Sequence, residues 1–170
     1  MVILFSKRKS KIEEEIIEIL LKYGGDYITD KKTIITDSKF TFVSKYKCSE
    51  ITLKKGIAVF CDDTDKFEKQ ELPQNMIGIC EENNKTALEL FKKNSISVIT
   101  CGMNSKNTVT LSSLNDNTLL TSLQRTVTDS KGTDITPSEF KVKLNKKYNP
   151  FAVMSCVAVL LINGIMPTEF

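Results

Sequence analysis

Short apolar segments alternate with segments of helical periodicity through the first half of the chain, and this alternation constrains the fold more than any other sequence feature. The apolar segments are residues 2–5, 57–61, 76–80 and 97–101. Runs this short and this continuously apolar are typical of parallel strands buried on both faces of a sheet. Residues 11–23 and 83–93 carry apolar side chains at the spacing of amphipathic helices. The alternation predicts an α/β fold in three layers, with a mostly parallel sheet and helices on both of its faces.

The alternation of apolar strands and amphipathic helices ends in the second half of the chain. Residues 109–144 are rich in Thr, Ser and Leu, and they contain a turn signal at Lys131-Gly132. We predict a small antiparallel β annex, with strands near residues 108–114, 119–127 and 139–144. An apolar helix over residues 150–162, ended by Asn163-Gly164, follows the annex.

We expect a single domain over residues 1–170. Its predicted parts are a Rossmann-like part over 1–105, the antiparallel annex over 106–147 and a closing helix over 148–166. Met1 stands directly before the first strand, which favours a natural start of the chain.

Local signals in the first half predict a cap and two further β-segments. Ser10 precedes the first helix and Glu13 follows three residues later, which is the spacing of a capping box. We interpret the three glutamates at 13–15 as a solvated helix face. Residues 27–36 and 40–46 have β-type sequences separated by a turn signal.

The chain has no histidine, and this limits the chemistry available to it. Ser-His-Asp and Cys-His catalytic pairs and histidine metal sites are excluded. The five cysteines are Cys48, Cys61, Cys80, Cys101 and Cys156. They are widely spaced, form no CxxC pair and lie in or beside apolar stretches. We therefore predict free core thiols in a reducing compartment rather than disulfides or a zinc site.

Charge and hydropathy exclude two classes of partner. The net charge is only +3, and the lysines are spread along the chain, so we expect no nucleic-acid partner. The longest apolar run covers residues 151–162, whereas a membrane helix needs roughly 20 residues. We therefore expect a soluble, cytoplasmic protein without a membrane span.

Two loops at predicted strand ends carry the candidate binding residues. The candidate anion site consists of Lys7, Arg8, Lys9 and Ser10, at a helix N-terminus where backbone N–H groups attract anions. This loop has no glycine with which to wrap a phosphate, so a solvated basic turn is the alternative. The candidate metal ligands are Asp62, Asp63 and Asp65, which follow a strand end. Lys66 stands among them and favours the alternative of an acidic loop neutralised by lysine.

Three stretches of the second half match motifs that occur together in one enzyme family. Val98-Ile99-Thr100-Cys101-Gly102 resembles a vitfG strand, and Lys131-Gly132 with Phe140-Lys141-Val142 resembles a dG…f.v hairpin. Residues 144–165 resemble l.G.HN.yNalAAiAva..lGi, with Tyr148-Asn149 on the His-Asn pair. Together these stretches resemble the central, ATP-binding domain of the Mur ligases and the related folylpolyglutamate synthetases.

The first half resembles the same domain, but it departs at the functional positions. Residues 2–24 resemble the P-loop unit v.gVTGTNGKTTT, with residues 6–10 in place of the glycine-rich loop. Ser44 falls near the family's acidic magnesium ligand, and Lys66 falls on its histidine. The family forms an acyl-phosphate from ATP, which an amine then attacks. Because phosphate loop, metal carboxylate and histidine are all changed, the resemblance implies a degenerate domain with no catalytic residue and no bound cofactor or metal.

The resemblance covers nearly the whole chain, but only the family's central domain. Faces that the flanking domains would cover are then available for self-association or a protein partner. We expect a non-catalytic domain, a pseudoenzyme, that acts through protein contacts, with the resemblance implying a bacterial partner in cell-wall synthesis. The alternatives are a nucleotide- or phosphate-binding protein or residual ATP-dependent amide ligase, and a regulator that binds another ligand in the vacated pocket.

Overall fold

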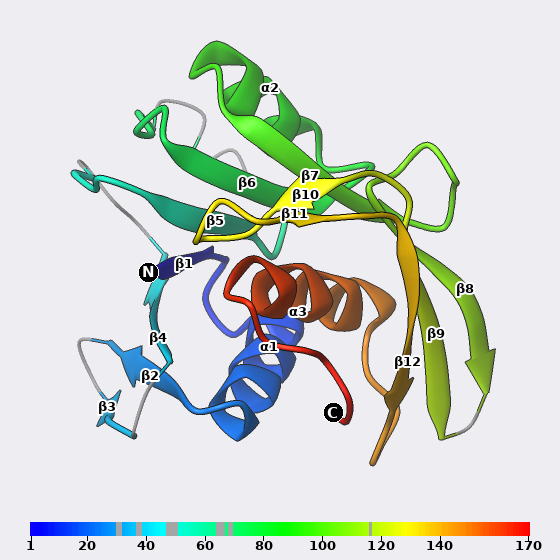
Figure 1. Cartoon of the computed structure of the whole chain (residues 1–170). Coiled ribbons are helices and arrows are strands. Elements are labelled where there is room, and N and C mark those ends of the chain that lie inside the picture. The colour runs from blue at the N-terminus through cyan, green and yellow to red at the C-terminus, as the bar shows by residue number, and fades with distance from the viewer. Residues whose placement is uncertain (30–31, 37–38, 47–50, 64–66, 68–69, 116) are drawn as a thin grey trace.

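The computed structural model describes residues 1–29, 32–36, 39–46, 51–63, 67, 70–115 and 117–170. Within them the chain forms an α/β structure with a ten-stranded mixed sheet, three α-helices and a separate two-stranded antiparallel sheet (Figure 1). The helices are α1 (Lys11–Lys22), α2 (Lys85–Lys93) and α3 (Pro150–Ile162). The strands are β1 (Val2–Phe5), β2 (Gly25–Ile28), β3 (Thr33–Ile34), β4 (Phe40–Lys45), β5 (Gly56–Phe60), β6 (Met76–Glu81), β7 (Ser97–Gly102), β8 (Val109–Asn115), β9 (Thr118–Leu123), β10 (Val127–Thr128), β11 (Asp134–Ile135) and β12 (Ser138–Lys143).

The large sheet is mostly parallel, as predicted. Its strand order is β12-β9-β8-β7-β6-β5-β1-β4-β2-β3. All neighbours from β2 to β8 in this order are parallel, whereas β2–β3, β8–β9 and β9–β12 are antiparallel. In the strand order, β4 and β2 lie on one side of β1, whereas β5, which follows β4 in the chain, lies on the other side of β1. The order of the strands therefore reverses at β1, which is the kind of position where open α/β sheets bind ligands.

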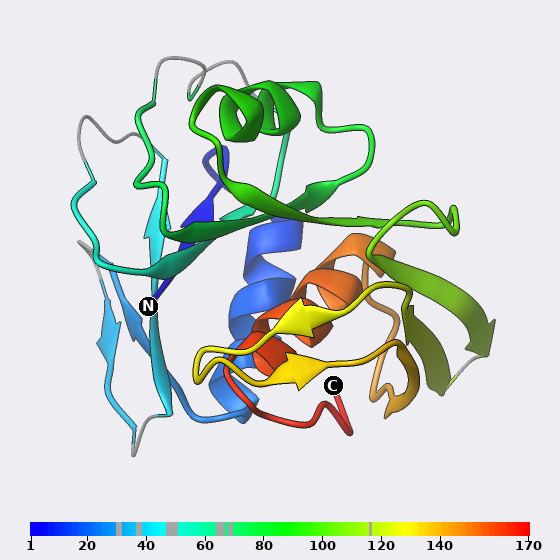
Figure 2. The same ribbon diagram turned by 45° about the horizontal axis from the view of Figure 1, so that its top comes forward.

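Apolar side chains pack on both faces of the sheet. Val2 and Leu4 belong to one core cluster together with residues of α1 and α3, whereas Ile3 and Phe5 belong to a second cluster with residues of α2. Successive side chains of a strand point to opposite faces, so the two clusters lie on opposite sides of β1. The sheet curves around α1 and α3, and α2 lies outside the curve (Figures 1 and 2).

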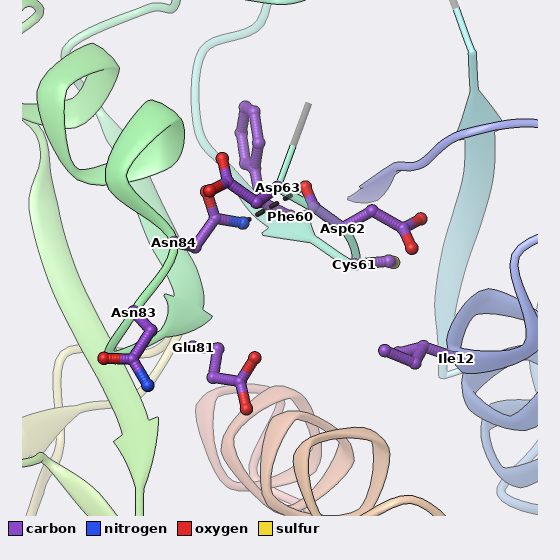
Figure 3. A pocket seen from close by; sticks show the side chains of 8 residues that line it. All are labelled: Ile12, Phe60, Cys61, Asp62, Asp63, Glu81, Asn83 and Asn84. Atoms are coloured by element: carbon purple, nitrogen blue, oxygen red, sulfur yellow. Dashed lines mark hydrogen bonds between the residues drawn. The ribbon is translucent and has the colours of Figure 1, made fainter. Parts of the chain in front are cut away.

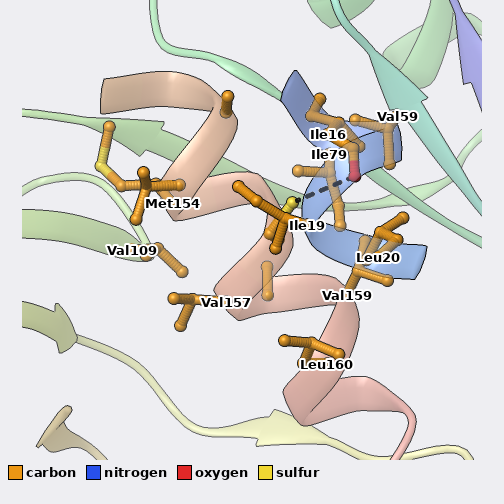
Figure 4. Packing of buried hydrophobic residues seen from close by; sticks show 14 of the residues in the cluster. Ile16, Ile19, Leu20, Val59, Ile79, Val109, Met154, Val157, Val159 and Leu160 are labelled. Carbon is orange, nitrogen blue, oxygen red and sulfur yellow. Dashed lines mark hydrogen bonds between the residues drawn. The ribbon is translucent and has the colours of Figure 1, made fainter. Parts of the chain in front are cut away.

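Helix α3 is enclosed on all sides. Every residue from Phe151 to Ile162 is buried. Figure 4 shows how α3 packs against α1. The Asn149 side chain accepts the N–H of Phe151 at 2.9 Å, and Gly164 ends the helix at φ +70°. The prediction of a helix over 150–162 is confirmed at both ends. In the part of the chain that the structure describes, no helix combines the length and apolar character needed to cross a bilayer.

Two β predictions need correction. Residues 27–36 form no single strand: β2 ends at Ile28, β3 spans Thr33–Ile34, and the two pair antiparallel with Tyr27 opposite Ile34. The predicted annex strands are antiparallel, but β8 pairs parallel with β7, so β8, β9 and β12 extend the main sheet. The free edge of β7 has backbone N–H and C=O groups that need partners, and β8 supplies them. Only β10 and β11 form a separate sheet.

Candidate functional site

The central parallel strands bring four loops to one edge of the sheet. Ser6 follows β1, Ser44 is near the end of β4, Asp62 follows β5, and Glu81 ends β6. These four strands are neighbours in the sheet, so their carboxyl ends lie side by side. This edge therefore collects the residues of both candidate loops.

A pocket of about 250 Å³ lies at this edge, between the start of α1 and the ends of β5 and β6 (Figure 3). It is lined by Ile12, Phe60, Cys61, Asp62, Asp63, Glu81, Asn83 and Asn84. Three of these side chains are carboxylates and two are carboxamides, and none of the described lining residues is basic. The pocket is therefore acidic.

The two candidate loops bind each other at the side of this pocket. The backbone N–H of Lys7 donates to Oδ2 of Asp62 at 3.1 Å, and the Lys7 ammonium nitrogen lies 3.4 Å from Oδ1. The side chain of Asp62 is 8% exposed. An N–H group that would hold a phosphate oxygen in a working phosphate loop therefore holds the protein's own carboxylate.

The other residues of the candidate anion site divide into two groups. Ser10 is buried and its Oγ accepts the N–H of Glu13 at 3.3 Å, so it caps α1 as predicted. Arg8 and Lys9 are exposed. Lys9 has φ +60°, a left-handed conformation that glycine adopts with less strain. The loop therefore makes its turn without the glycine that a phosphate loop uses.

Among the candidate metal ligands, the structure brings Asp62 and Asp63 to the pocket. Asp63 accepts the N–H of Thr86 at 3.4 Å, at the first turn of α2. Asn84 caps the same helix and donates to the backbone oxygen of Asp62 at 3.1 Å. Asp65 lies outside the described residues, as does Lys66. Within the described ranges, no group of three Cys, Asp or Glu side chains is arranged to hold a metal ion.

Glu13 is a site residue that the sequence analysis misplaced. It is only 2% exposed, so the interpretation of a solvated face is wrong for this residue, although Glu14 is exposed. The signal was present in the sequence: Glu13 stands three residues before Ile16 and seven before Leu20, which places it on the apolar stripe of the helix.

The surroundings of Glu13 alter the pKa of its carboxyl group. Burial raises this pKa, and the charge of Asp62 raises it further. The hydroxyl groups of Ser44, Ser6 and Tyr46 act in the opposite direction and lower it. Glu13 is therefore a buried carboxyl group with hydroxyl neighbours, on the side of the edge nearest β1 and β4.

The cysteines supply no activated nucleophile in the described structure. Cys61, Cys80, Cys101 and Cys156 are free and buried, which confirms the prediction of core thiols for these four; Cys48 lies outside the described residues. Burial raises the pKa of each thiol, to about 12 for Cys80. Because the thiolate is the reactive form, these four side chains act as small apolar residues.

Fold and site together define an α/β domain with an acidic pocket at the carboxyl edge of its sheet and a basic loop that binds an internal carboxylate. Models of known protein families give no match to the chain, and neither do curated proteins.

Proposed function

We propose that this chain is a non-catalytic domain of the Mur-ligase central type, which acts in the cytoplasm through self-association or through a protein partner in cell-envelope synthesis. Residues of α1 and α3 share a core cluster on one face of the sheet and residues of α2 share a second cluster on the other, which supports a three-layer fold. The motifs over residues 98–102 and 144–165 support the family and the envelope partner.

The contact between Asp62 and Lys7 carries the non-catalytic part of this proposal. A triphosphate would have to displace Asp62 from a charge-assisted hydrogen bond. It would also meet the carboxylates of Asp63 and Glu81 in the adjoining pocket, which repel it. Phosphoryl transfer depends on positioning and on neutralising the phosphate charge, so the pairing of Lys7 with Asp62 and the acidity of the pocket support a non-catalytic role.

Thermal unfolding with and without millimolar ATP–Mg²⁺ tests this part. We expect no change in Tm, whereas a ligand at 100 times its Kd would add about 2.7 kcal/mol to the free energy of unfolding. An upward shift that disappears in the Lys7→Ala, Arg8→Ala, Lys9→Ala triple variant would contradict the proposal. Phosphate release that depends on the same residues would contradict it as well.

Removal of the internal carboxylate should expose the anion-binding capacity of the loop. In Asp62→Ala the N–H and ammonium groups of Lys7 lose their partner, so we expect inorganic phosphate to bind weakly to this variant and not to the natural chain. Asp63→Ala is the matched control, since Asp63 lines the same pocket without contacting Lys7. Calorimetric titration at low salt measures the difference. If Asp62→Ala binds phosphate no better than Asp63→Ala, then Asp62 is not what occupies the loop.

Two experiments test whether the chain acts through protein contacts. Sedimentation over a wide concentration range detects self-association, and cross-linking in native cells, with identification of the attached chains, detects a partner. A specific oligomer or an envelope-synthesis partner is the expected result. A monomer at every concentration, without a specific cross-linked chain, would contradict this part.

The pocket favours a second candidate, a regulator that binds a small ligand where the family binds nucleotide. Its volume of about 250 Å³ suits a ligand of few atoms, and its carboxylates favour a cationic one such as a primary amine. NMR titration with small amines and their matched alcohols tests this candidate. Shifts at Asp62 and Glu81 that occur with the amines and not with the alcohols would support it.

A further inference from the structure

Two buried oxygen atoms beside the loop after β1 make no hydrogen bond of normal geometry with the described residues, although the Ser6 hydroxyl lies near enough to Glu13 to lower its pKa. They are Oε1 of Glu13 and Oγ of Ser6, in side chains that are 2% and 0% exposed. A buried polar atom without a partner costs about 1–3 kcal/mol, so native proteins usually satisfy such atoms with a neighbour, water or an ion.

Further oxygen atoms face the same carboxyl group from a different strand. Ser44 and Tyr46 at the end of β4 and Ser6 at the end of β1 have hydroxyl groups close enough to the Glu13 carboxyl group to lower its pKa. The hydroxyl groups of Tyr27 and Ser44 are 3.0 Å apart and form a hydrogen bond. The ends of two neighbouring strands thus bring hydroxyl oxygens near the Glu13 carboxyl group, and oxygen atoms are the ligands that hard cations prefer.

The charges of this region do not balance at Glu13. None of the ion pairs between described residues includes Glu13, and the ammonium group of Lys7 is already paired with Asp62. A buried carboxylate without a compensating charge is strongly unfavourable. Glu13 must therefore bind either a proton, which its raised pKa favours, or a cation.

We propose that Glu13, with the hydroxyl oxygens of Ser6, Ser44 and Tyr46, binds a monovalent alkali cation at the carboxyl ends of β1 and β4. A monovalent ion matches the single carboxylate, whereas a divalent ion would leave one buried positive charge in excess. The site lies beside the acidic pocket, and the inference is independent of the proposed function because it requires neither a nucleotide nor a protein partner.

Unfolding of the full chain in NaCl, KCl, MgCl₂ or choline chloride at equal ionic strength tests the site, with bulky choline as the reference cation. At a cation concentration 100 times the Kd, the folded-to-unfolded ratio should be about 100-fold higher than in choline. Glu13→Gln should abolish this difference. Glu14→Gln should keep it, since Glu14 is the exposed neighbour on the same turn.

Several outcomes would overturn the assignment. Equal stability in choline and in both alkali salts would mean that Glu13 is simply protonated. A sodium or potassium effect that survives in Glu13→Gln would place the cation elsewhere, and an effect limited to MgCl₂ would contradict the charge match. If Glu13→Gln does not fold, Ser6→Ala replaces it and should weaken the cation effect. Sodium NMR linewidths, which broaden on binding, supply a readout independent of stability.

Discussion

At the scale of single residues, two carboxyl groups near the loop after β1 differ because their neighbours differ. Asp62 has the N–H and ammonium groups of Lys7 as partners, and its charge is neutralised. Glu13 is enclosed by α1, β1 and β4 and has hydroxyl neighbours in place of a cation. The same functional group is therefore a fixed internal anion in one position and a candidate cation ligand in the other.

A glycine in β6 shows how closely α2 approaches the sheet. A Cβ atom at Gly78 would lie 2.6 Å from the ring of Phe91, which is fully buried. We expect Gly78→Ala to lower the free energy of unfolding by about 1–3 kcal/mol, because the ring must move in a packed core. Urea unfolding measures the loss. Ser97→Ala, at the exposed start of neighbouring β7, is the control and should cost less than about 0.5 kcal/mol; an equal loss in both variants would contradict the expected overlap.

At the scale of the elements, α1 and the segment before α3 are joined by polar contacts around Glu18. The hydroxyl of Tyr148 donates to Oε1 of Glu18 at 3.0 Å, and the ammonium group of Lys146 pairs with Oε2. These contacts lie at the surface end of a helix pair whose shared face is apolar. They hold the segment that leads into α3 against α1, while the apolar face shared by the two helices supplies most of the packing energy.

The Glu18 contacts make stability depend on pH. The hydrogen bond from Lys146 is the main cause that lowers the pKa of Glu18 in the folded chain, and Tyr148 contributes. A lowered folded-state pKa gives stability that is present above the unfolded pKa and is lost as the pH falls through the folded value. Lys146→Met should therefore reduce the loss of stability between neutral pH and about pH 3, by less than about 1 kcal/mol because the pair is partly exposed. Urea unfolding at both pH values measures the change, and Lys147→Met, at an exposed neighbour, should leave it unaltered.

At the scale of the whole molecule, the last residues pair with the end of β12 and contact the end of α1. The N–H of Lys143 donates to the oxygen of Thr168 at 3.0 Å, and the N–H of Phe170 donates to the oxygen of Lys143 at 2.8 Å. Phe170 is fully buried and its ring packs edge-on against Tyr23. The last residue of β12 is thereby paired with the chain's own backbone, which shortens the strand edge open to pairing with other chains.

The hydroxyl group of Tyr23 holds this segment in place, so its removal should loosen the segment. It accepts the N–H groups of Thr168 at 2.7 Å and Glu169 at 3.0 Å. We expect Tyr23→Phe to lower the free energy of unfolding by about 1–2 kcal/mol, from net values near 1 kcal/mol for each hydrogen bond. Amide hydrogen exchange should become faster at Thr168 and Glu169, while the Phe170 amide, bonded to Lys143, serves as the internal control. Unchanged exchange at the first two amides would show that the hydroxyl does not hold the segment.

Much of the secondary structure could be predicted because its signals are local. The apolar run of β1, the cap at Ser10 and the Asn163-Gly164 stop after α3 all act within a few residues. The candidate site was predictable only in part. Asp62 and Asp63 line the pocket, but the burial of Glu13 and the bonding of Lys7 to Asp62 were missed.

The sequence by itself determined the three helices and most of the strands, because apolar spacing and capping act within one or two turns of the chain. Only the tertiary structure decided which loops meet and which charges cancel. Lys7 and Asp62 are 55 residues apart, and they come together because β5 lies beside β1 in the sheet. Burial and pairing are properties of neighbours in space, and these properties decide whether an acidic or basic loop is a free binding site or an internal contact.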